Sequence, residues 1–147
     1  MNVITTFTEK RRQKQMKYER SVLREVNIEE LKRKVQEYFG STRLTAGLFK
    51  NPGILEACYD VALESYLLGA NLSKFAHSGE AIESTLKRCE PEETHLIDTL
   101  YNFLLYWGAG EEGFYSEALY FQCEQYVRSW WMAGYEKGRR RYKLRLH

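Results

Sequence analysis

Residues 52–75 read PGILEACYDVALESYLLGANLSKF, and their few polar side chains recur at helical intervals. Glu56, Asp60, Glu64 and Asn71 are four, four and seven residues apart, which puts them on one narrow stripe of a helix. Nearly every other position is apolar. We therefore expect this helix to lie at the centre of the fold, with only that stripe in water.

The neighbouring segments also carry helix signals. Asn27 followed by Glu30 is typical of an N-terminal cap, and the apolar residues after it fall on one face. That face comprises Ile28, Leu31, Val35 and Tyr38. Pro91 followed by two glutamates is typical of a first helical turn. Gly134 and Gly138, four residues apart near the end of the chain, favour a close contact with another helix.

These patterns predict an all-α protein. No segment shows the two-residue alternation of a half-buried strand. The predicted helices span about 8–25, 28–39, 52–75, 79–88, 91–107 and 115–138, with loops at 40–53 and 108–113. The chain of 147 residues suits one domain. We expect a single compact domain, 1–147, of five or six helices packed around two central apolar helices, about 52–75 and 91–107.

Charge is strongly segregated along the chain. The formal net charge is +2, but residues 1–39 balance to +4, residues 40–136 to −8 and residues 137–147 to +6. Basic ends of this kind could bind an anionic partner such as nucleic acid or lipid headgroups. They could equally fold back on the acidic middle of the same chain, which the small net charge favours.

The two basic ends differ in their expected structure. Glu9 to Gln15 contains no apolar residue, so the N-terminal helix is expected to project into solvent. The basic C-terminal tail, residues 137–147, contains Leu144 and Leu146, which favour docking on the acidic body over a free nucleic-acid-binding arm. The candidate interaction surface comprises Lys10, Arg11, Arg12, Lys14, Lys17, Arg139, Arg140, Arg141, Lys143 and Arg145.

Motifs for catalysis or metal binding are scarce. The sequence has no nucleophile elbow, phosphate loop or Rossmann glycine pattern. Glu92 and His95 share one helix face, but a di-iron site needs a second such pair, so we expect no metal and no cofactor. Cys58 and Cys123 fit a buried apolar role. Cys89 follows Lys87 and Arg88, whose charges could lower the pKa of its thiol, although a reactive role is the less favoured interpretation.

Several classes of protein are disfavoured. Three widely spaced cysteines do not form a disulfide framework and suit a reducing cytoplasm. The first residues lack the apolar core of a secretory signal, and no apolar run is long enough to cross a membrane.

The chain also resembles a known family. The residues that carry the resemblance are Phe7 to Lys10, Glu19 and Arg20, Glu64 to Ala70, and the run from Trp130 to His147. In these stretches the sequence resembles the YbaK-type family of small Bacillus proteins of unknown function. The resemblance covers nearly the whole chain and implies a cytoplasmic protein of a spore-forming Gram-positive bacterium. It implies no catalytic residues, because the family has no assigned activity.

From these observations we expect a non-enzymatic protein-protein interaction or adaptor module, whose partner is another protein. The alternative is a nucleic-acid-binding module that uses the basic first helix and the arginine-rich tail.

Overall fold

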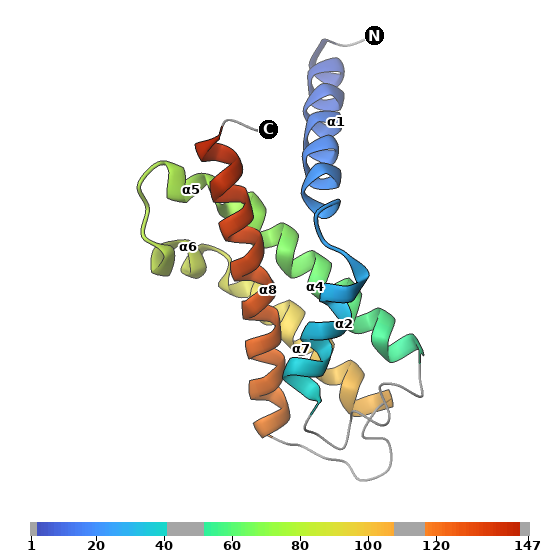
Figure 1. The fold of residues 1–147 in the computed structure, drawn as a ribbon. Coiled ribbons are helices and arrows are strands. Elements are labelled where there is room, and N and C mark those ends of the chain that lie inside the picture. The colour runs from blue at the N-terminus through green and yellow to red at the C-terminus, as the bar shows by residue number, and fades with distance from the viewer. Residues whose placement is uncertain (1–2, 41–51, 108–116, 145–147) are drawn as a thin grey trace.

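The computed structural model describes residues 3–40, 52–107 and 117–144, and every regular element in these ranges is a helix (Figure 1). The helices are α1 (Val3–Leu23), α2 (Ile28–Phe39), α4 (Pro52–Leu72), α5 (Lys74–His77), α6 (Ile82–Arg88), α7 (Glu90–Trp107) and α8 (Glu117–Lys143). The predicted all-α class is confirmed. The predicted loop at 108–113, and residues 41–51 of the other, lie outside the described residues.

Local sequence signals place the bounds of α2 and the start of α4 as predicted, whereas α1 begins at Val3, before the expected start near Thr8, and α8 continues past Gly138 to Lys143. The side-chain oxygen of Asn27 accepts a hydrogen bond from the backbone N–H of Glu30 at 2.8 Å, which caps α2. On α4, Glu56, Asp60 and Glu64 are exposed, as the polar stripe predicts, and most of the remaining surface of the helix is wholly or partly buried.

The backbones of α4 and α8 meet in close contact. A Cβ atom on Gly69 would overlap the carbonyl oxygen of Trp131, and one on Gly134 would overlap the carbonyl oxygen of Tyr66. A Cβ atom on Gly138 would overlap the hydroxyl of Ser73 and approach the carbonyl oxygen of Ala70, near the C-terminal end of α4. The close helix contact predicted for Gly134 and Gly138 is therefore confirmed, and its partner is the central helix α4.

The other helices surround this pair. Helix α7 packs against both α4 and α8, and the fully buried Leu100 and Leu104 belong to the core cluster. Helix α2 crosses α8 near one end, while α5 and α6 lie near the C-terminal half of α8 (Figure 1). The buried carboxylate of Glu93 accepts two hydrogen bonds from Arg128, at 3.0 and 2.5 Å, and thereby joins α7 to α8.

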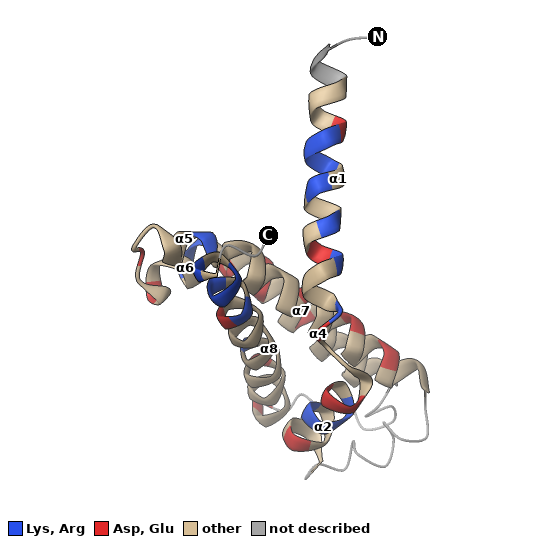
Figure 2. Cartoon of the chain, turned by 45° about the horizontal axis from the view of Figure 1, so that its top comes forward, with Lys and Arg blue, Asp and Glu red and all other residues tan. Residues whose placement is uncertain are grey.

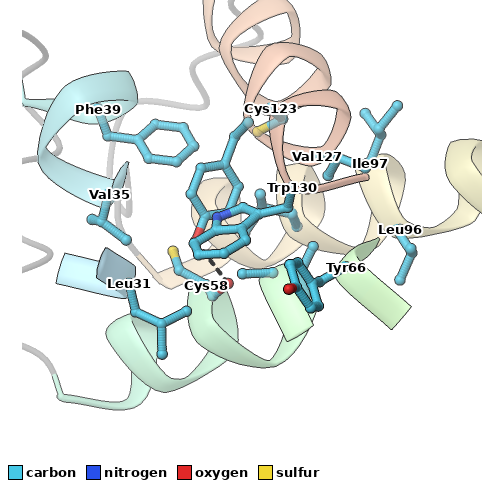
Figure 3. Packing of buried hydrophobic residues seen from close by; sticks show 14 of the residues in the cluster. Leu31, Val35, Phe39, Cys58, Tyr66, Leu96, Ile97, Cys123, Val127 and Trp130 are labelled. Atoms are coloured by element: carbon cyan, nitrogen blue, oxygen red, sulfur yellow. Dashed lines mark hydrogen bonds between the residues drawn. The ribbon is translucent and has the colours of Figure 1, made fainter. Parts of the chain in front are cut away.

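Aromatic side chains of α8 fill the core between α2 and α4 (Figure 3). The hydroxyl of Tyr126 donates a hydrogen bond to the carbonyl of Cys58 at 3.0 Å, and its ring centroid lies 5.2 Å from that of Phe39. Trp130 meets Tyr66 edge-on, with ring centroids 6.1 Å apart. Much of the aromatic content of the sequence is thus used to bury α8.

The predicted buried face of α2 is correct at two positions, partly correct at Tyr38 and wrong at Ile28. Leu31 and Val35 are buried, but Ile28 is 49% exposed and Phe39 is 0% exposed. Tyr38 is only partly buried. Steps of three and of four residues from Val35 both suit a helix, so periodicity does not distinguish Tyr38 from Phe39. Both rings contact that of Tyr126, at centroid distances of 5.2 Å for Phe39 and 6.0 Å for Tyr38, but only Phe39 is fully enclosed by the core.

All three cysteines are free and buried, as expected for Cys58 and Cys123, and the burial of Cys89 argues against the less favoured reactive role. Cys89 packs in a second cluster with Trp131 and Tyr135. Burial, together with the nearby charge of Glu93, raises the pKa of the Cys89 thiol to about 11. Burial raises the pKa of Cys58 and of Cys123 to about 12.

We predict that Gly134→Ala destabilises the protein. The added methyl group gains up to about 1 kcal/mol in helix propensity but forces α8 away from the backbone of α4, for a net loss of about 1–3 kcal/mol. Urea unfolding followed by circular dichroism measures the difference. Gln125→Ala, at an exposed position of the same helix, is the control and should stay within about 0.5 kcal/mol of the wild type. Equal stability of Gly134→Ala and wild type would contradict the close contact.

We also predict that the native thiols are inert. Their raised pKa values keep them protonated at about pH 8, and burial excludes the reagent, so Ellman's reagent should label them only after denaturation. Absorbance of the released thiolate measures the reaction. Rapid labelling of native protein that disappears in Cys89→Ala would show that Cys89 is accessible and reactive.

Candidate functional site

Helix α1 is held only by its second half. The hydroxyl of Tyr18 donates a hydrogen bond to the carbonyl of Ala70 at 3.3 Å, and Gln15 donates one to the side chain of Asn71 at 3.0 Å. Val22 is fully buried in the core. The first half of the helix extends beyond the rest of the chain (Figures 1 and 2), as the absence of apolar residues from Glu9 to Gln15 predicted.

The projecting half of α1 carries a stripe of cations. Lys10, Lys14 and Lys17 are spaced four and three residues apart, so they share one face of the helix, and all three are exposed. We call these three residues the basic stripe. Phe7, three residues before Lys10, continues the same face and is 63% exposed. Arg11 and Arg12 are also exposed, on other sides of the helix.

The basic C-terminal residues begin inside α8 and pack against the end of α1. Lys137 forms an ion pair with Glu25, the second residue after α1. Arg141 donates a hydrogen bond to the hydroxyl of Ser21 at 2.5 Å and lies 3.7 Å from the Glu25 carboxylate. Ser21 is four residues beyond Lys17, so Arg141 approaches the face of α1 that carries the basic stripe.

The tail does pack on the body, since Gly138 contacts Ala70 and the ring of Tyr142 stacks on that of His77 with centroids 5.7 Å apart. The expected docking is nevertheless corrected in two respects. The described contacts of Lys137 and Arg141 are with the N-terminal segment, not with the acidic middle of the chain. Leu144 is 66% exposed, because α8 continues straight to Lys143 and carries this residue past its last neighbours. Leu146 and Arg145 lie outside the described residues.

The structure therefore brings together only part of the predicted surface. Arg141 joins the base of α1, whereas Arg139, Arg140 and Lys143 remain exposed on the last turns of α8. In Figure 2 the Lys and Arg positions, coloured on the ribbon, gather along α1 and at this end of α8.

Helix α4 carries an acidic surface, opposite in charge to the basic stripe. From the sequence it was expected only to be the solvent-exposed side of a central helix. Glu56, Asp60 and Glu64 are exposed, and none of the three forms an ion pair with another described residue. We call them the acidic stripe. Other carboxylates of the acidic middle are already engaged: Glu80 pairs with Arg88, and Glu93 with Arg128. The spacing of four residues between these carboxylates in the sequence indicated that they share one face of the helix.

A groove of about 500 Å³ lies between α2 and α8. Lys34 crosses it, with its ammonium 4.3 Å above the ring of Trp130 and hydrogen-bonded to the backbone and hydroxyl oxygens of Ser129. Burial lowers the pKa of Lys34. Lys137 at the rim pairs with Glu25, as described above. The cations of this groove are thus largely used to attach α2 and the end of α1 to α8.

The residues weighed as a metal site lie on the surface. Glu92 and His95 are exposed on α7 and line a shallow groove with Glu64 of α4. Within the described ranges, no group of three or more His, Cys, Asp or Glu side chains is arranged to hold a metal ion. A search of the same ranges for a helix sufficiently long and apolar to traverse a lipid bilayer found none.

Comparison with known proteins agrees with the resemblance noted in the sequence. The chain is 27% identical over 148 residues to the uncharacterised protein YbaK of Bacillus subtilis (strain 168), a match that covers 99% of both chains. No solved structure matches it. Residues 1–147 match the family described as "Protein of unknown function (DUF2521)". The chain, with its projecting basic helix, therefore belongs to the DUF2521 family of proteins of unknown function.

Proposed function

We propose that this protein is a non-enzymatic protein-interaction module, in which the projecting half of α1 binds an acidic surface of another protein. The observation that supports this proposal most directly is the basic stripe with Phe7 at its end. An exposed aromatic side chain in line with three lysines combines an apolar anchor with charge selectivity, which is how a helix recognises a groove on a protein.

The composition of α1 favours a protein over the other anionic partners. Duplex nucleic acid is bound chiefly through phosphate contacts, which need the cations but not the exposed Phe7. A helix lying on a membrane surface gathers its apolar side chains on one side. Among the side chains of α1 that the structure describes, the two large exposed apolar residues, Phe7 and Met16, are nine positions apart and so point in opposite directions.

The rest of the molecule supports a binding role for α1. Lys34 in the groove between α2 and α8 is engaged with Ser129 and Trp130, so this groove serves packing. We further propose the cytoplasm as the site of action, since three free thiols suit a reducing compartment. A fluorescent fusion found outside the cytoplasm would contradict this location.

The test compares three forms of the full chain. The first is the wild type, and the second is Lys10→Glu/Lys14→Glu/Lys17→Glu. The control, Lys32→Glu/Lys74→Glu/Lys87→Glu, reverses the same number of exposed lysines on α2, α5 and α6. Each form is immobilised and exposed to nuclease-treated extract of the native host, retained proteins are identified by mass spectrometry, and candidates are purified for direct binding measurements.

We expect a purified partner that binds wild type and control equally and the α1 variant at least about tenfold more weakly, because three attractive charges become repulsive. The absence of any protein that distinguishes wild type from the α1 variant would contradict the proposal. The proposal would also be contradicted if the wild type and the control bind a DNA duplex or anionic lipid vesicles and the α1 variant does not. Duplex binding of this kind, falling steeply with salt, would indicate the nucleic-acid-binding function.

A further inference from the structure

We propose that the protein which α1 binds is a second copy of this chain: the basic stripe of each copy docks on the acidic stripe of the other. The resulting dimer has two-fold symmetry, so that both copies give and receive the same contact. This inference rests on the proposed function, because it names the partner of α1.

The projecting half of α1 lacks support within its own chain. Residues 7–17 are all exposed, and the contacts with α4 begin at Gln15. A short, highly charged helix without a buried face is only marginally stable in water. Contact with another molecule supplies the packing that the chain itself does not provide for this half of α1.

The acidic stripe matches the basic stripe in charge and in length. Three exposed carboxylates, Glu56, Asp60 and Glu64, face three exposed ammonium groups of opposite sign. With a rise of 1.5 Å per residue, the acidic stripe is about 12 Å long and the basic stripe about 10.5 Å. Two helices laid side by side along these stripes can therefore pair each lysine with one carboxylate.

The two stripes of one chain do not meet each other. Helix α1 is attached to α4 at Ala70 and Asn71, near the C-terminal end of α4, whereas the acidic stripe begins near its N-terminal end. From that attachment the first half of α1 projects away from the body in both views of the molecule (Figures 1 and 2). Pairing of the basic stripe with the acidic stripe consequently requires two copies.

The apolar surroundings of both stripes suit such a contact. Phe7 lies at one end of the basic stripe, and the acidic stripe is flanked on α4 by the half-buried side chains of Tyr59 and Leu63. Exposed ion pairs contribute little each, so burial of these apolar groups and the duplication of the contact by symmetry are needed for a measurable affinity.

The test uses charge reversal on either side of the contact. The α1 variant is Lys10→Glu/Lys14→Glu/Lys17→Glu, and the α4 variant is Glu56→Lys/Asp60→Lys/Glu64→Lys. Sedimentation velocity over a concentration series measures the dissociation constant of each full-length protein at about 50 mM salt, where charge screening is weak. Circular dichroism verifies that each variant folds, as expected for changes at exposed positions.

We expect the wild type to form a dimer whose dissociation constant rises with salt. Each variant alone should dimerise at least about tenfold more weakly, because like charges then face each other in both contacts. An equimolar mixture of the two variants should regain a dimer, since each reversed stripe now meets an opposite charge on the other chain. The Lys32, Lys74 and Lys87 control should dimerise like the wild type.

Three outcomes would overturn the inference: a wild type that stays monomeric up to about 100 µM, variants that dimerise as well as the wild type, or a mixture that fails to associate. If the wild type is monomeric but binds a purified host protein that the α1 variant no longer binds, a second copy is not the partner of α1. The proposed function would then still hold. If the wild type is monomeric and no host protein depends on α1, both are wrong.

Discussion

The direct contact between the backbones of α4 and α8 is the constraint on which the other helices depend. With glycine at positions 69 and 134, no side chain separates the two helices, so their crossing point and mutual register are set within a narrow range. That register carries Tyr126 and Trp130 toward α2 and Arg128 toward Glu93 of α7. It also brings the last turns of α8 beside the end of α1.

Features that depend on one or two helical turns could be predicted from the sequence. The cap at Asn27 and the polar stripe on α4 arise from neighbouring residues, and both are present in the structure. Features that depend on residues distant in the sequence could not be predicted in this way. Cys89 is buried because Trp131 and Tyr135, about forty positions later, cover it. Nothing in the sequence around Cys89 indicates that contact.

The same distinction applies to the candidate site. Exposure of the five residues of α1 in the candidate surface follows from a local lack of apolar neighbours, so it could be predicted. The partners of the C-terminal cations could not be predicted, because they depend on the direction of α8 beyond the point where it crosses α4. That direction places Lys137 and Arg141 beside Glu25 and leaves Leu144 in solvent.

The attachment of α1 to α4 through its second half has a consequence for how this family can diverge. No side chain between residues 7 and 17 is buried, so replacements there leave the core intact. Under the proposed function, folding and recognition are encoded in separate parts of one chain, and selection can act on either without opposing the other. A new binding specificity could evolve through substitutions in about three turns of a single helix.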